Sequence, residues 1–153
     1  MSELFIPSTN DSPLPPRYAA KLVQPVEGRY AFVPGNRPFD NGGLLNLIGG
    51  GIHEQEGESP HDAIIREAYE EARLTLDPQF LHQIGGVEGE VVNCRGERRL
   101  ARWILFGYDA KINPDKIKYS FTPSQLKAPR TLELPFSDLA LAAVAFAEEA
   151  RRH

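Results

Sequence analysis

The sequence predicts a single domain of the α/β or α+β class, because segments with strand and helix patterns are mixed along one continuous chain. Its 153 residues are enough for one domain with a hydrophobic core, and its 41% hydrophobic and 25% charged residues are ordinary values for a globular protein. We find no repeat and no linker within residues 17–153. Residues 1–16 are rich in Pro and Ser and predict a flexible N-terminal arm before this domain.

The first strands are predicted before residue 50. Residues 17–24 and 30–33 have strand-like composition, and the Pro-Val-Glu-Gly turn between them predicts that they pair. Residues 34–43 form a loop rich in turn residues, and residues 44–48 are a short apolar run typical of a buried strand. The glycines at 49–51 follow directly and predict a tight turn.

A helix is predicted to begin at Ser59 and to end near Arg73. Ser59 is a good N-cap, Pro60 suits the first helical position, and Asp62 favours the positive end of the helix. Apolar residues recur at the helical period on one face, which indicates that this face is buried. These residues are Ile64, Ile65, Ala68, Tyr69 and Ala72.

The second half of the chain predicts three strands and a closing helix. The first of these strands contains Gly85 and Gly86, which predict a bend or bulge, and residues 93–96 predict the hairpin turn that follows it. Ser137 is the predicted cap of the last helix. The predicted strands are residues 80–92, 99–110 and 118–121, and the predicted helix is residues 137–152.

Composition excludes several classes of function. The net charge of −4 argues against broad binding to nucleic acids or membrane surfaces, both of which need a basic face. No apolar run approaches the roughly 20 residues that span a membrane, and the N-terminus lacks a signal-peptide pattern. Cys94 is the single cysteine, which excludes an internal disulfide and favours a cytoplasmic location. We expect Cys94 to be chemically inert.

Three carboxylates share one face of the predicted helix at residues 59–73. At about 100° per residue, Glu67, Glu70 and Glu71 fall within about 100° of arc. Like charges at these spacings repel one another, so helix stability alone does not favour the pattern. A divalent cation such as Mg²⁺ would compensate the charges because it prefers oxygen ligands. The alternative is a solvated acidic face, which is the commoner origin of such patterns.

The glycines that precede the helix strengthen the first interpretation. Without side chains, they allow a phosphate to approach the backbone or direct a carbonyl at a metal ion. Glycines and carboxylates together predict metal-assisted attack of water on a phosphate bond. In such a site the cation neutralises phosphate charge and a carboxylate accepts a proton from the water.

The stretch from Gly50 to Leu74 resembles the Nudix box, G-x5-E-x7-R-E-U-x-E-E-x-G-U, where U is a bulky apolar residue. Glu58 precedes Arg66 by eight positions, and REAYEE at 66–71 matches R-E-U-x-E-E. The chain departs from the box in two places. Two extra residues lie between Gly50 and Glu58, and Arg73 stands in place of the glycine.

The resemblance implies a Nudix-type α/β/α sandwich with a central mixed sheet. It also implies hydrolysis, dependent on Mg²⁺ or Mn²⁺, of a diphosphate linkage in a nucleoside diphosphate derivative. In that family pattern Glu70 and Glu71 are the main metal ligands, and Glu67 binds metal or helps to activate water. Arg66 orients these carboxylates and pairs with Glu58, and the carbonyl of Gly50, or alternatively of Gly49, is a further metal ligand.

The substrate and a base outside the box are less defined. The strand cations are candidate contacts for phosphate, and Arg102 is the one chosen, because a guanidinium offers a bidentate fork; most of them are expected to face solvent. They are Arg17, Lys21, Arg98, Arg99 and Arg102. A base in a later loop would be one of Glu88, Glu90 and Glu97. Residues 89–91 carry neither the proline of ADP-ribose hydrolases nor the tyrosine of dinucleoside polyphosphate hydrolases.

One alternative function remains at the level of the sequence, and a homodimer is a separate expectation. A Nudix-like module that binds a nucleotide for regulation, without catalysis, is favoured by the insertion and by Arg73, whereas the complete carboxylate set favours an enzyme. A homodimer is suggested by the apolar residues Leu4, Phe5 and Ile6 in the arm.

Overall fold

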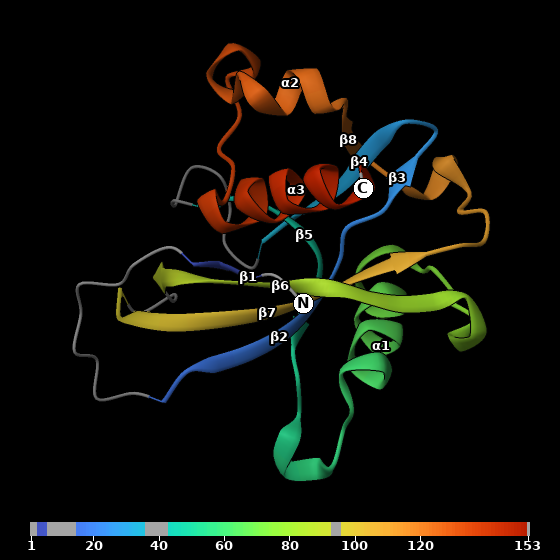
Figure 1. Ribbon diagram of the computed structural model, residues 1–153, viewed down its shortest axis with the longest axis vertical. Coiled ribbons are helices and arrows are strands. Elements are labelled where there is room, and N and C mark those ends of the chain that lie inside the picture. The colour runs from blue at the N-terminus through green and yellow to red at the C-terminus, as the bar shows by residue number, and fades with distance from the viewer. Residues whose placement is uncertain (1–2, 6–14, 36–42, 93–95, 153) are drawn as a thin grey trace.

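The computed structural model describes residues 3–5, 15–35, 43–92 and 96–152, and eight strands in this part of the chain form one mixed sheet (Figure 1). The strand order is β1-β6-β7-β2-β5-β4-β3, and β8 pairs with β4. β1 pairs with β6 and β2 pairs with β7 in parallel, and the other pairs are antiparallel. The strands are β1 (Glu3–Phe5), β2 (Arg17–Leu22), β3 (Pro25–Val26), β4 (Arg29–Pro34), β5 (Leu45–Gly51), β6 (Leu81–Val92), β7 (Arg98–Tyr108) and β8 (Tyr119–Phe121).

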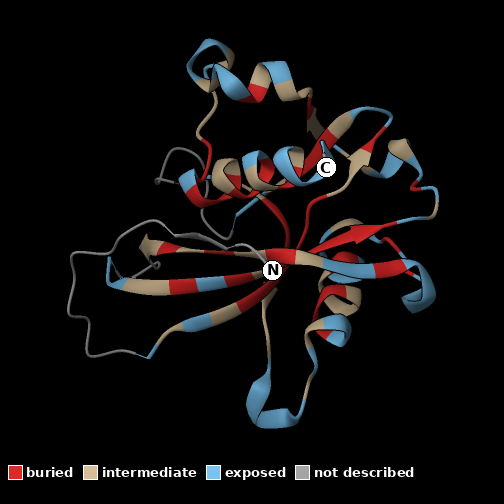
Figure 2. Ribbon diagram, in the orientation of Figure 1, coloured by how far each residue is buried: buried red, intermediate tan, exposed pale blue. Residues whose placement is uncertain are grey.

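Helices cover both faces of the sheet. They are α1 (Pro60–Ala72), α2 (Pro123–Lys127) and α3 (Asp138–Arg151). Because side chains alternate along a strand, neighbouring residues enter different cores. On β2, Ala19 packs in the core beneath α3 and Ala20 in the core beneath α1, and Leu47 and Ile48 divide in the same way on β5. Figure 2 shows buried residues on the central strands and on the helix faces turned toward them. The predicted α/β/α sandwich with a mixed sheet is confirmed.

Most predicted elements are present, but one predicted pairing is wrong. β4 does not pair with β2, because β5 and β7 occupy both edges of β2. The turn at Glu27 and Gly28 has positive φ at both residues and instead joins β4 to the short β3. The predicted bulge in β6 is confirmed by a shift of register between Gln83 and Gly85.

The glycines at 49–51 were predicted to form a turn, and this prediction is wrong. They continue β5 as an extended strand and pair with Ala19–Lys21 of β2. Gly49 has φ of 139°, which favours glycine. A Cβ at this position would overlap the carbonyl oxygen of Ala20, so the close approach of β2 also requires glycine.

The N-terminal segment differs in part from the predicted arm. Glu3–Phe5 forms β1, which pairs with Gly86–Glu88 of β6. Ile6, the hairpin residues 93–95 with Cys94, and residues 36–42 of the predicted loop lie outside the described residues. The division into an arm and a domain, and the homodimer, stay predictions.

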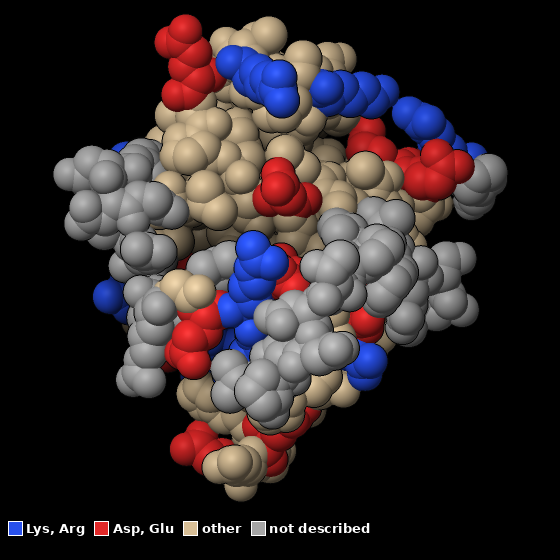
Figure 3. All heavy atoms as spheres, turned by 90° about the vertical axis from the view of Figure 1, so that its left-hand side faces the viewer, with Lys and Arg blue, Asp and Glu red and all other residues tan. Residues whose placement is uncertain are grey.

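The short helix α2 was not predicted. Its signal is present in the sequence, because Thr122 and Gln125 form a capping box and Pro123 occupies the first turn. Within the described ranges, no helix has the length and apolar character needed to cross a membrane. Acidic and basic side chains both occur on the face drawn in Figure 3. The expected lack of broad nucleic-acid binding stays a prediction.

Candidate active site

The predicted catalytic helix begins and ends as its sequence indicates. The Ser59 side chain accepts a hydrogen bond from the Asp62 N–H, and Arg73 is the C-cap. The two extra residues are accommodated in an exposed 3-10 helix, Glu54–Glu56, which ends at Gly57 in the left-handed conformation. This turn directly precedes the Ser59 cap of α1.

Arg66 connects the carboxylates of this region. Its Nε and Nη2 donate to the two carboxylate oxygens of Glu58 at 2.8 and 3.0 Å, and Nη2 also donates to the Gly51 carbonyl at 3.0 Å. Nη1 donates to Glu67 at 2.9 Å and to Glu70 at 3.3 Å. One guanidinium therefore ties α1 to β5 and holds two of the three carboxylates, as the box pattern predicts for Arg66 and Glu58.

The ion pair between Arg66 and Glu58 makes the stability of the protein depend on pH. Hydrogen bonding to Arg66 lowers the pKa of Glu58 to about 2 from an ordinary value of 4.5. Because the pKa is lower in the folded state, the pair stabilises fully above pH 4.5 and loses its effect as the pH falls toward 2. We expect Glu58→Gln to reduce the free energy of unfolding at pH 7 by about 1 kcal/mol. Urea unfolding at pH 7 and pH 3 measures this, and an equal reduction at both values would contradict it.

Glu71 is held at the same edge of β5 as Arg66. Its Oε1 accepts a hydrogen bond of 2.7 Å from the Gly49 N–H. Desolvation of the carboxylate raises the pKa of Glu71 to about 7, and this outweighs the hydrogen bond from Gly49 and the charge of Lys21, which lower it. Glu71 as a whole residue is exposed. The pKa of its carboxyl group is therefore raised only while that group lies against β5. A carboxylate that is crowded and incompletely compensated is suited to a cation.

Lys21 was expected to face solvent, and this expectation is wrong. Its side chain is buried, with 5% of its surface exposed, and Nζ donates to the carbonyls of Leu47 and Gly49. Burial lowers the pKa of Lys21 to about 8. Lys21 lies within the apolar run AAKLV, but its residue type led to the expectation of a solvent-facing side chain.

The donor set fits a hard divalent cation. Among the described contacts, hydrogen bonds engage one oxygen each of Glu67, Glu70 and Glu71 and leave the other oxygen for a metal. A Cβ at Gly50 would lie 2.6 Å from Oε1 of Glu67, so the missing side chain leaves room for that carboxylate. Within the described ranges, no three acidic, His or Cys side chains already converge as a metal cluster.

The register distinguishes the possible carbonyl ligands. Gly49 and Gly51 turn their backbone groups toward α1 and Lys21, as their side-chain hydrogen bonds show. Backbone groups alternate in direction along an antiparallel pair, so Gly50 directs its N–H and C=O toward its partner Ala20. This geometry favours Gly49 over Gly50 as the residue that presents a carbonyl at the site. The assignment of Gly50 as a ligand stays a prediction.

Arg102 lies away from this cluster on β7. It donates to Glu88 at 2.6 Å and to the Tyr18 hydroxyl at 3.1 Å, and 46% of its side chain is exposed. These residues line a cavity of about 300 Å³ on the β2–β7–β6 part of the sheet. The other two candidate bases, Glu90 and Glu97, are on β6 and in the turn before β7. In the described hydrogen bonds and ion pairs, Arg102 and Glu88 bind each other and not the α1 carboxylates.

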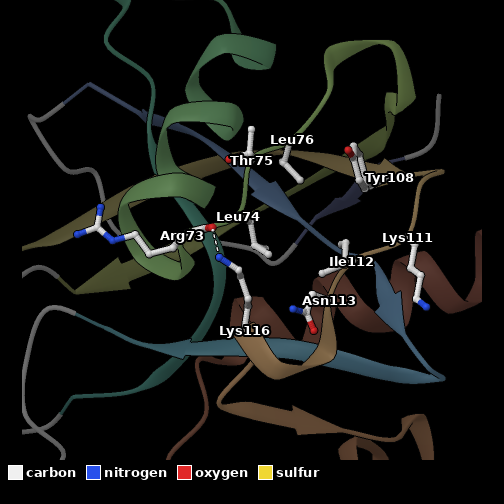
Figure 4. Close-up of a pocket in the computed structure, with 9 residues that line it drawn as sticks. All are labelled: Arg73, Leu74, Thr75, Leu76, Tyr108, Lys111, Ile112, Asn113 and Lys116. Carbon is white, nitrogen blue, oxygen red and sulfur yellow. Dashed lines mark hydrogen bonds between the residues drawn. The ribbon is translucent and has the colours of Figure 1, made fainter.

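Arg73 adopts a left-handed conformation with φ of 55° where the box has glycine. Its guanidinium lies over the Tyr69 ring, and Lys116 donates to its carbonyl at 3.0 Å. Arg73 and Lys116 border a cavity of about 220 Å³, and Figure 4 shows the Arg73 guanidinium pointing away from the interior of this cavity. The structure thus accommodates Arg73 without extending the helix.

The strained cap gives a second testable prediction. A non-glycine residue in this conformation costs about 1 kcal/mol, so Arg73→Gly should raise the free energy of unfolding by up to that amount. Thermal and urea unfolding measure the change. Arg73→Ala is the matched control, because it removes the same side chain and keeps the strain. Equal stability of the Gly and Ala variants would contradict the prediction.

Comparison with known proteins identifies the fold. No family model matches the sequence, and no curated protein matches it. Solved structures do match. A MutT protein from Methanosarcina mazei Go1 has a TM-score of 0.63 and 17% identity over 93% of this chain and 97% of that one. A Nudix hydrolase from Nitrosomonas europaea has a TM-score of 0.58 and 17% identity over 88% and 90%. This chain has the Nudix fold.

A third structure with this fold is the Nudix domain of NrtR from Shewanella oneidensis, complexed with ADP ribose. It has a TM-score of 0.58 and 19% identity over 92% of this chain and 93% of that one. NrtR from the same organism has also been solved with a 27mer DNA, and there the match covers 60% of the NrtR chain. Hydrolases and a DNA-binding protein therefore share the Nudix fold with this chain.

Proposed function

We propose that the protein hydrolyses a diphosphate linkage in a nucleoside diphosphate derivative and depends on a divalent metal ion. The observation that carries this proposal is the Arg66 network, which holds Glu67 and Glu70, together with the Gly49 N–H, which holds Glu71 at the edge of β5 that Arg66 also contacts. An acidic face that was merely solvated would not need an arginine bonded to two carboxylates, a glutamate partner and a strand carbonyl. The Nudix fold supports the proposal.

The residues have distinct proposed roles. Glu70 and Glu71 hold Mg²⁺ or Mn²⁺, which when bound neutralises the diphosphate and activates water. Glu67 is either a further metal ligand or the acceptor of the proton from water. Arg66 orients Glu67 through a hydrogen bond of 2.9 Å from Nη1. Gly50 leaves room for the Glu67 carboxylate. Arg102, on β7, is retained as the proposed contact for a remote part of the substrate.

A panel of nucleoside diphosphate derivatives tests the proposal. We expect release of a phosphorylated product with Mg²⁺ or Mn²⁺ and none with a chelator. The panel should include nucleoside diphosphate sugars, ADP-ribose, dinucleotides and dinucleoside polyphosphates, because the site does not select among them. The proposal fails if no member is hydrolysed with either metal.

A regulatory module that binds a nucleotide without cutting it is the second candidate. The similarity to the Nudix domain of NrtR favours it. Isothermal titration with the same panel distinguishes the two functions. Tight binding of one nucleotide without turnover would favour the regulatory module.

A further inference from the structure

Lys21 places a buried ammonium group where β4 separates from β5. Nζ donates to the Leu47 carbonyl at 3.3 Å and to the Gly49 carbonyl at 3.1 Å, and it lies 4.7 Å from the centre of the Trp103 ring. β4 pairs with β5 only at Leu45–Leu47, so the Gly49 carbonyl lies beyond the end of that pairing. The ammonium therefore takes the position of a missing strand partner.

The same strand edge carries the carboxylates of the candidate active site. The N–H and C=O of a residue in a strand point to the same side, and at Gly49 the N–H donates to Glu71 while the C=O accepts from Lys21. An ammonium and a carboxylate thus flank one glycine. The charges of Glu71 and Glu67 favour the charged form of Lys21, and the charge of Arg17 opposes it.

Capping the two carbonyls does not by itself require a charge. A neutral amide donor would satisfy them, and burial of an ammonium is costly unless it is paired. The positive charge is accounted for by the neighbouring carboxylates, which repel one another on α1. Lys21 therefore serves both as a hydrogen-bond donor and as a source of positive charge beside the site.

We propose that Lys21 is the resident counter-ion of Glu67 and Glu71 and competes with a divalent cation for these carboxylates. The inference rests on the proposed metal-dependent function. When no metal is bound, Lys21 offsets part of the charge of Glu71, which the Gly49 N–H holds in place, and so weakens binding of the free metal ion. The site then takes up its cation more readily together with an anionic diphosphate, which adds its own ligands and negative charge.

Binding of Mn²⁺ to the full-length protein, followed by electron paramagnetic resonance of the free ion, tests this role. Lys21→Gln retains donors but no charge, and Lys21→Met retains neither. We expect both variants to bind Mn²⁺ about tenfold more tightly than wild type, because a like charge near the cation is removed. Lys127→Gln, which removes an exposed lysine on α2, is the control and should leave the affinity unchanged.

Unchanged or weaker binding in both Lys21 variants would overturn the proposal. Tighter binding in Lys21→Met alone would also overturn it, because the effect would then follow the lost hydrogen bonds and not the charge. If the variants do not fold, the NMR signal of the Lys21 ammonium in wild type decides. It should shift on titration with Mg²⁺, and an unmoved signal at saturating Mg²⁺ would refute the competition. Failure of the proposed function can be distinguished from failure of this Lys21 proposal, because the former appears as a lack of hydrolysis by the wild-type protein.

Discussion

Glu70→Gln and Glu71→Gln are each expected to lower metal-dependent hydrolysis by at least about 100-fold while the protein stays folded. Glutamine has nearly the same volume as glutamate but lacks the charge that holds a cation. In Glu71→Gln the amide oxygen can still accept the hydrogen bond from Gly49. The measurement is kcat and KM on a substrate that wild type cleaves, across a range of Mg²⁺ concentrations.

Glu149→Gln is the matched control for these variants. Glu149 is an exposed carboxylate on α3, which covers the other face of the sheet, and its pair with Arg152 contributes little to stability. Its activity should equal that of wild type. Wild-type rates in Glu70→Gln and Glu71→Gln would refute the metal assignment.

Stability provides an independent test of Glu71. Its pKa is raised to about 7 in the folded protein, against an ordinary value of 4.5, so its ionisation disfavours folding above pH 7. This cost declines as the pH falls from 7 and is gone below 4.5, where both states bind the proton. We therefore expect Glu71→Gln to melt at a higher temperature than wild type at pH 8, without metal, and at a similar temperature at pH 4.5. Loss of activity with a gain in stability is typical of a functional residue.

The sequence was most informative where local signals agree. For α1, the Ser59 cap, the first-turn proline and the apolar period all favour the same helix, and the structure has it at Pro60–Ala72. The β6 bulge was likewise visible because Gly85 is a local signal. Arg66 and Glu58 are only eight residues apart, and their pairing at 2.8 Å agrees with the box.

Long-range contacts explain what the sequence did not show. A glycine triplet is compatible with a turn or with a strand, and the choice was made by β2, whose backbone packs directly against Gly49. The pairing of β4 with β8 and of β2 with β7 likewise joins strands that are distant in the sequence. Lys21 was assigned to solvent by its residue type, and only the three-dimensional contacts to Leu47 and Trp103 reveal its burial.

Gly49 and Gly50 are expected to fail in different ways when each is replaced by alanine. At Gly49 the new Cβ would overlap the Ala20 carbonyl and lie 2.8 Å from the Lys21 Cα, both of which are backbone atoms. Relief requires β2 and β5 to separate. We expect Gly49→Ala to reduce the free energy of unfolding by about 4 kcal/mol, measured by urea unfolding.

At Gly50 the new Cβ would instead meet the end of the Glu67 side chain, 2.6 Å from Oε1. A flexible side chain can move, so Gly50→Ala should fold with a loss of about 1 kcal/mol or less. The displaced Glu67 would lose its 2.9 Å hydrogen bond from Arg66, and hydrolysis should fall by about 10–100-fold. The KM for substrate and the Mg²⁺ dependence would show whether the lost activity is a loss of metal binding.

Gly57→Ala separates these contacts from the general cost of replacing glycine. Gly57 also has positive φ, 75°, but a Cβ there would have open space around it. Gly57→Ala should therefore reduce the free energy of unfolding by only about 1 kcal/mol, the cost of a non-glycine residue at positive φ, and should keep its activity. If Gly49→Ala were no less stable than Gly57→Ala, β2 and β5 would not be packed as closely as the structure places them. If Gly50→Ala kept full activity, Glu67 would act without its present orientation, and Arg66 would lose its role of positioning that carboxylate.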